Sequence, residues 1–188
     1  DFMLEVRLSS IPTDPLYQDQ WHLGGDTSAI PGYGRAGRTH VQTETAWDTT
    51  RGTSDVVVAV LDDAFDTGHE DLAPNLFINP GEIAGNGIDD DNNSVIDDIS
   101  GWDFNSNDND TSPGNPNANH GSAVAGVAIA RADNGLGGVG AAPGCGFMPM
   151  QTGNAASDFA TTWRYVAGLT GQGWRGADLL NMSIGIGR

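Results

Sequence analysis

An aspartate and a histidine, 58 positions apart in the chain, have the chemistry of a catalytic pair. Asp62 ends a short apolar run, and His120 precedes a series of small residues long enough for a helix. A carboxylate beside an imidazole fixes the ring's tautomer and stabilises its charged form, which leaves the second ring nitrogen to act as a general base. These residue types therefore indicate general-base catalysis, although a strand-end aspartate is more often a turn former or a cap.

A second group of chemically active residues lies in the aspartate- and asparagine-rich stretch 88–98. Its oxygen-bearing side chains recur at alternate positions, as the ligands of a calcium loop do, with a backbone carbonyl at the seventh position. The candidate ligands are Asp89, Asp91, Asn93, Val95 through its carbonyl, and Asp97. Ser94 and Ser100 stand where an EF-hand needs glycine and glutamate. The spacing therefore favours a calcium site of another kind over a solvated turn.

Strand-like and helix-like segments alternate from residue 55 onward, and they must position these residues. The apolar, strand-like segments are DVVVAVL (55–61), FMPM (147–150) and DLLNMSI (178–184). The helical segments are 120–132 and 157–168, and residues 79–119 are expected to be mostly loop. This order predicts an α/β fold with a doubly wound parallel sheet. Ligands of such sheets bind at the carboxyl ends of strands, where Asp62 is expected.

Composition and charge limit the possible functions. The chain has 188 residues and a net charge of −17, from 25 acidic residues against eight arginines. Such a charge repels phosphate backbones, so we expect no nucleic-acid partner, and no apolar run is long enough to cross a membrane. Fifteen of the acids lie between Arg51 and Arg131 without a basic side chain among them, which indicates a bound cation. We expect an irregular N-terminal arm over residues 1–50 and one domain over 51–188.

Several strings resemble motifs of the subtilisin-like serine proteases. VAVLDDAFDTGHEDL (58–72) and NHGSAVAG (119–126) resemble the aspartate and histidine motifs, and ADLLNMSIG (177–185) is similar to the substrate-lining strand. DPLYQDQWHL (14–23) resembles the mature N-terminus of the kexin and furin-like branch. The resemblance implies a subtilisin-like fold with Asp62 and His120 in the catalytic triad. It also implies substrate binding by Asp63, which would face a basic side chain, and by Ser183, Ile184 and Gly185.

The family's nucleophile motif, Gly-Thr-Ser followed by small residues, does not occur in these 188 residues, nor does its oxyanion-binding asparagine. The resemblance therefore implies an incomplete sheet, the N-terminal part of a catalytic domain. The serine would lie on a C-terminal part that is a separate chain or missing, and this chain alone would be nearly inactive. The leading hypothesis is a calcium-dependent serine endopeptidase that acts on polypeptides. The alternatives are a calcium-stabilised pseudoprotease or peptide-binding module, and a truncated ordinary protease.

The resemblance to the convertase branch implies a second calcium site. Its ligands would be the carboxylates of Asp14 and Asp71, the side chain of Asn134, and the carbonyls of Arg131, Leu136 and Gly138. Such a site would tether the N-terminal arm to the domain. The resemblance and the use of calcium together imply a secreted or extracytoplasmic protein. Cys145 is the single cysteine, so the chain forms no internal disulfide.

Overall fold

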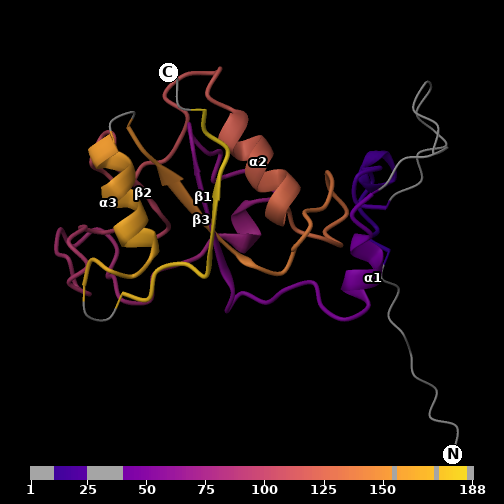
Figure 1. Cartoon of the computed structure of the whole chain (residues 1–188), viewed down its shortest axis with the longest axis horizontal. Helices are drawn as coiled ribbons and strands as arrows, with labels where there is room; N and C mark the ends of the chain where they lie inside the picture. Colours follow the sequence, from indigo (N-terminus) through magenta and orange to yellow (C-terminus); the bar gives the residue numbers. More distant parts are fainter. Residues whose placement is uncertain (1–10, 25–39, 154–155, 172–173, 186–188) are drawn as a thin grey trace, which may run out of the picture.

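A parallel β-sheet forms the centre of the molecule (Figure 1). The computed structural model describes residues 11–24, 40–153, 156–171 and 174–185. Within these residues the strands are β1 (Val57–Asp62), β2 (Trp102–Asp103), β3 (Gly146–Gln151) and β4 (Leu179–Met182). All pairings are parallel, in the order β2-β3-β1-β4. The predicted α/β fold with a parallel sheet is confirmed.

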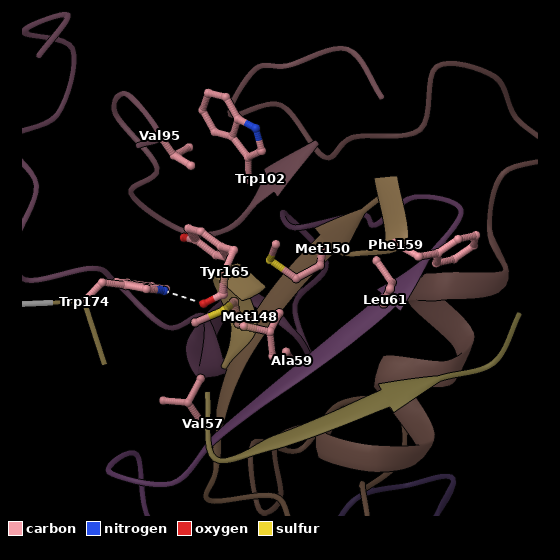
Figure 2. Packing of buried hydrophobic residues seen from close by; sticks show 11 residues of the cluster. Val57, Ala59, Leu61, Val95, Trp102, Met148, Met150, Phe159, Tyr165 and Trp174 are labelled. Atoms are coloured by element: carbon pink, nitrogen blue, oxygen red, sulfur yellow. Dashed lines mark hydrogen bonds between the residues drawn. The ribbon is translucent and has the colours of Figure 1, made fainter. Parts of the chain in front are cut away.

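Strand β1 lies between β3 and β4, and all six of its side chains are buried. Side chains alternate between the faces of a strand, so a strand covered on both faces needs a continuous apolar run. Val57, Ala59 and Leu61 face a core that includes Tyr165, as Figure 2 shows. Val58 and Val60 pack on the opposite face, with residues of the histidine-bearing helix. This double burial explains why the segment was recognisable from sequence.

Two helices cover the opposite faces of the sheet, which makes it doubly wound (Figure 1). They are α2 (His120–Ile129) and α3 (Ala156–Val166). Helix α2 ends three residues before the predicted boundary, because Ala130 is extended and the amide of Arg131 donates instead to the Asp71 carbonyl at 2.9 Å. Helix α3 ends two residues early, before Gly168, whose φ of +68° is a left-handed conformation that favours glycine after a helix.

Strand β2 was not predicted. Its two residues pair with Met150 and Gln151 of β3, inside the stretch that was expected to be mostly loop. Two residues are too few to produce a strand periodicity in the sequence. Apart from β2, the stretch 79–119 consists of loops. The short 3-10 helix η3 (Ala73–Asn75) lies shortly before this stretch. Strand β2 therefore anchors one end of the acidic loop to the sheet.

The described parts of the predicted N-terminal arm pack against the loop that follows α2. They contain the 3-10 helix η1 (Tyr17–Asp19) and helix α1 (Thr43–Trp47). Tyr17, Leu23 and Trp47 form a separate buried cluster with Val139, and the Trp47 indole donates to the Ala141 carbonyl at 2.9 Å. The arm thus contacts the loop that follows α2. No helix within the described residues is both long and apolar enough to cross a membrane.

Candidate active site

The carboxyl end of β1 is the point where the chain changes direction across the sheet. From β1 the chain leads to β2 and returns through α2 to β3, and both of these strands lie on one side of β1. The connection through α3 then leads from β3 to β4 on the other side of β1. Loops diverge at such a switch point and leave a crevice in which α/β proteins bind ligands. Asp62 is the last residue of β1, and Ser183 directly follows β4. The topology therefore brings the predicted catalytic and substrate-binding segments to one edge.

Asp62 and His120 are in direct contact. The imidazole Nδ1 lies 2.7 Å from Asp62 Oδ1, which also accepts a hydrogen bond from the Asp63 amide at 2.8 Å. The Asp62 side chain is 3% exposed and that of His120 is 58% exposed. Asp62 Oδ2 is buried and accepts no hydrogen bond from the described residues. A buried carboxylate with few donors attracts the imidazole strongly, whereas the rest of the ring faces the solvent.

A glycine permits the close approach of α2 to the end of β1. A Cβ at Gly121 would lie 2.5 Å from the Ala64 carbonyl oxygen and 2.9 Å from Asp62 Cβ. The first turn of α2 therefore rests directly on the turn that follows β1. The hydroxyl of Ser122 accepts a hydrogen bond from the Asp66 amide at 2.8 Å and adds a second link between the two segments.

We expect Gly121→Ala to destabilise the protein by about 1–3 kcal/mol, because the new methyl group overpacks backbone that has no room to move. Gly126→Ala is the matched control, since this glycine of the same helix has nothing within 4 Å of an added Cβ. In the control, alanine's helix propensity predicts a gain of roughly 0.5–1 kcal/mol. Urea unfolding measures both changes, and a stabilised Gly121→Ala variant would contradict this account of the contact.

The electrostatics of the site favour a basic imidazole. The hydrogen bond to Asp62, the charge of Asp62 and the charge of Asp63 together raise the pKa of His120 above its ordinary 6.5, against the opposing effect of burial. Burial works to raise the pKa of Asp63, but hydrogen bonds from the amides of Gly121, Ala64 and His120 outweigh it and lower that pKa below its usual range. The site thus places a histidine with increased proton affinity beside two carboxylates.

A cavity of about 250 Å³ opens beside the pair. Its lining consists of Asp62, Asp63, His120, Thr152, Gly153, Phe159, Ser183 and Ile184. The predicted substrate-binding residues Asp63, Ser183 and Ile184 therefore adjoin Asp62 and His120, whereas Gly185 is exposed and is not part of this lining. Thr152 and Gly153 were not predicted, although their position directly after β3 places them at the same strand edge.

A group of three carboxylates lies in the acidic loop. Oxygen atoms of Glu82, Asp91 and Asp98 all lie within 4.8 Å of one another. Asp98 is 1% exposed, and its neighbours Tyr165 and Asn93 donate hydrogen bonds to it. Burial, with smaller contributions from the charges of Asp91 and Glu82, raises the pKa of Asp98 to about 6 despite these donors. Negative charge is therefore concentrated here at a cost that a cation would relieve.

Only Asp91 of the ligands predicted in this loop belongs to the carboxylate group. Asp89 accepts from the amides of Asn93 and Ser94, and Asp97 accepts from those of Asn86 and Gly87. Asn93 bridges the Asp98 carboxylate and the amide of Val95, whose side chain packs in the core. Glu82 and Asp98 were not predicted as ligands. The arrangement of acids in the sequence contains no signal for Glu82, because the folded loop, not the local spacing, brings it close.

The residues of the second predicted calcium site also come together. Asp14 and Asp71 are buried, at 3% and 5% exposure. Asn134 connects them, because its backbone amide donates to Asp14 at 3.3 Å and its side-chain amide donates to Asp71 at 2.8 Å. The amide of Gly138 donates to Asp71 at 3.3 Å.

Arg131 and Leu136, which were also predicted to contribute carbonyl oxygens, lie close to this group. The backbone amide of Arg131 donates to the Asp71 carbonyl, and that of Leu136 donates to the Asn134 side chain. Calcium prefers carboxylate, amide and carbonyl oxygens, and both this group and the carboxylates of the acidic loop supply them. The donor chemistry of both groups therefore fits Ca²⁺.

The parallel fold and the contact between Asp62 and His120 define an α/β protein with a carboxylate–imidazole pair at the carboxyl end of its strand β1. Residues 53–188 match the subtilase family, and the chain belongs to that family. Over 93% of its length it is 29% identical to the halolysin-like extracellular serine protease Nep of Natrialba magadii. Over 90% of its length it is 30% identical to the calcium-dependent protease of Nostoc sp..

A solved structure supports the same relationship. The serine protease of Aeromonas sobria, determined in complex with its chaperone, matches 94% of this chain with a TM-score of 0.65 and 25% identity. The chain spans 26% of Nep, 21% of the Nostoc protease and 26% of the Aeromonas protein. It thus corresponds to about a quarter or less of each of these relatives.

Proposed function

We propose that this chain supplies the aspartate and histidine of a calcium-dependent, subtilisin-like serine endopeptidase. The observation that carries the proposal is the 2.7 Å contact between Asp62 Oδ1 and His120 Nδ1 beside the cavity at the strand edge. The serine would lie on a polypeptide segment outside these 188 residues, on a separate chain or on a continuation of this one. Family membership and the names of the relatives support a serine protease.

The geometry supports acyl transfer with His120 as the proton carrier. With Nδ1 bonded to Asp62, the imidazole takes the serine proton at Nε2 as the serine oxygen forms a bond to the substrate carbonyl carbon. The same nitrogen then donates that proton to the leaving amine when the peptide bond breaks. Water repeats the sequence to release the acyl group and restore the serine. Asp62 stabilises the imidazolium in each half of the reaction.

Polypeptide is the substrate class that the cavity supports. The segment Ser183–Gly185 continues from the edge strand β4 and borders the cavity through its first two residues. An extended substrate can add to such an edge by main-chain hydrogen bonds, which leaves sequence preference to side-chain pockets. The apolar wall at Phe159 would be one of those pockets.

Calcium would bind at the two oxygen-rich groups. Glu82, Asp91 and Asp98 would hold one ion, and Asp14, Asp71 and Asn134 another. A bound ion neutralises the carboxylates and joins distant segments of the chain. The name of the Nostoc relative supports calcium use, and the description of Nep as extracellular supports secretion.

A fluorophosphonate probe tests the proposal. We expect mass analysis of the native material to find a labelled serine outside residues 1–188, and His120→Ala to abolish the labelling. Hydrolysis of a casein or fluorogenic peptide should be lost with it. If the native material consists of these 188 residues alone and no serine reacts, the proposal fails and the pseudoprotease or peptide-binding module takes its place.

The activity should increase with pH through a midpoint above 6.5, because the raised pKa of His120 keeps the imidazole protonated, and unable to accept the serine proton, at lower pH. The dependence of kcat/KM on pH in the free enzyme measures this midpoint. We expect Asp62→Asn to lower it, since the ring loses the carboxylate that raises its proton affinity. A midpoint below 6.5 in the unmodified protein would contradict the effect of Asp62.

A further inference from the structure

The first turn of α2 receives its cap from a distant part of the chain. The first amides of any α-helix have no partner within the helix. Asn119 occupies the N-cap position of α2, but its side chain forms no capping hydrogen bond. The carboxylate of Asp63 takes this place: Oδ1 accepts from the Gly121 amide at 2.8 Å, and Oδ2 accepts from the His120 amide at 3.4 Å. The helix is thus capped by the strand-end turn.

Consecutive carboxylates hold the side chain and the backbone of one histidine. Asp62 binds the imidazole of His120, and Asp63 binds the amide of the same residue. Asp63 is itself fixed, because Oδ1 also accepts from the Ala64 amide at 2.7 Å. The imidazole is largely exposed, and Asp62 is the hydrogen-bond partner that the structure gives it. The position of the ring therefore depends on how firmly its backbone is held.

The charge of Asp63 suits this position. A carboxylate at a helix N-terminus is stabilised by the partial positive charge of the free amides. The lowered pKa of Asp63 agrees with this contact and keeps the carboxylate ionised at neutral pH. The effect of the cap is local, since it acts on the turn that bears His120.

We propose that Asp63 is a positioning residue, whose carboxylate fastens the first turn of α2 to the end of β1 and thereby holds His120 on Asp62. The catalytic consequence rests on the proposed function, whereas the capping contact does not. The competing role is the one implied by family resemblance, recognition of a basic substrate side chain. Asp63 borders the cavity, so the test must separate these two roles.

NMR of the isotope-labelled protein tests the positioning role without any enzyme activity. In the unmodified protein we expect the Gly121 amide shift to titrate with a midpoint below the ordinary range of aspartate, and this titration should disappear in Asp63→Asn. Asp63→Ala should speed hydrogen exchange of the Gly121 amide by about tenfold and broaden the low-field Nδ1 proton of His120. Asp63→Asn should keep exchange within about threefold, because asparagine caps about as well as aspartate.

Asp66→Ala is the matched control. It removes a carboxylate from the same turn, and the hydrogen bond that this carboxylate accepts comes from the Gly68 amide, not from α2. It should change neither NMR signal. If the Gly121 amide of the unmodified protein shows no such titration, or Asp63→Ala leaves its exchange and the His120 signal unchanged, the proposal is overturned. The titration requires no alanine variant and so decides the question even if that variant does not fold.

Peptide kinetics provide the second readout. We expect Asp63→Ala to lower kcat by a similar factor for peptides with lysine and with alanine at the second residue before the scissile bond. A loss of more than about tenfold that is confined to the lysine peptide would overturn the proposal and assign Asp63 to substrate recognition. If the unmodified protein cleaves neither peptide, the proposed function fails, and the NMR result still decides whether Asp63 positions His120.

Discussion

Asp62→Asn should lower the kcat of peptide hydrolysis by about 10⁴-fold at neutral pH in the form of the protein that carries the serine. The amide cannot stabilise the imidazolium that forms in the transition state. It also favours the wrong tautomer of His120, because an amide N–H can donate to Nδ1. We expect KM to change little, since the lost interaction belongs to the transition state and not to substrate binding. Steady-state kinetics with a fluorogenic peptide measure both constants.

Two controls define this result. Asp66→Asn makes the same chemical change in the turn that follows, and should keep kcat within about twofold because its side chain does not contact His120. Urea unfolding of Asp62→Asn shows whether the fold persists. A folded Asp62→Asn variant with more than about a tenth of the normal kcat would rule out Asp62 as the partner of a general base.

Removal of calcium should produce the second large effect, on stability. We expect chelation to lower the thermal midpoint by roughly 5–10 °C, since a ligand at 100 times its Kd stabilises a protein by about 2.7 kcal/mol. Without the ion, the buried carboxylate of Asp98 lies beside the uncompensated charges of Asp91 and Glu82. The buried carboxylate of Asp71 then has neutral hydrogen-bond donors, the Asn134 side chain and the Gly138 amide, in place of a cation. Differential scanning calorimetry with and without excess EDTA measures the change, and added Ca²⁺ should reverse it.

Variants assign the effect to the two groups. Asp91→Asn should remove the loss of thermal midpoint that belongs to the acidic loop. Asp71→Asn should remove the loss that belongs to the group formed by Asp14, Asp71 and Asn134. Tyr165 contacts Asp98, so its ring should sensitise the luminescence of Tb³⁺ bound in the loop, and Asp91→Asn should abolish that emission. Asp66→Asn should change neither the midpoint nor the emission. An unchanged midpoint after chelation would contradict the calcium proposal.

The local sequence predicted those helices and strands that have a recognisable residue pattern of their own. The apolar run DVVVAVL (55–61) indicated a buried parallel strand, and both faces of the observed strand β1 pack against core residues. The small residues after His120 indicated a helix that could lie close to the sheet. Strand β2 could not be predicted in this way, because two residues become a strand only through their pairing with Met150 and Gln151.

The calcium groups illustrate the same difference. The alternate spacing in the acidic loop identified side chains whose oxygen atoms could bind an ion. It did not show which of these oxygen atoms instead accept hydrogen bonds from the backbone of the loop. In the folded loop Asp89 and Asp97 accept backbone amides, and Glu82 lies beside Asp91 and Asp98 instead. Which oxygens converge depends on the path of the loop in three dimensions.

The sequence by itself determined the chemistry of this protein: the acid and the imidazole, the order of the longer strands and helices, and the concentration of carboxylates that favours a cation. Only the tertiary structure decided which of these groups meet. It brought His120 to Asp62 across 58 residues, and it turned the carboxylate of Asp63 to the amides of α2. The reason is physical: a residue's chemistry is local, but its partners are set by long-range packing, here by a glycine that lets a helix rest on a strand end.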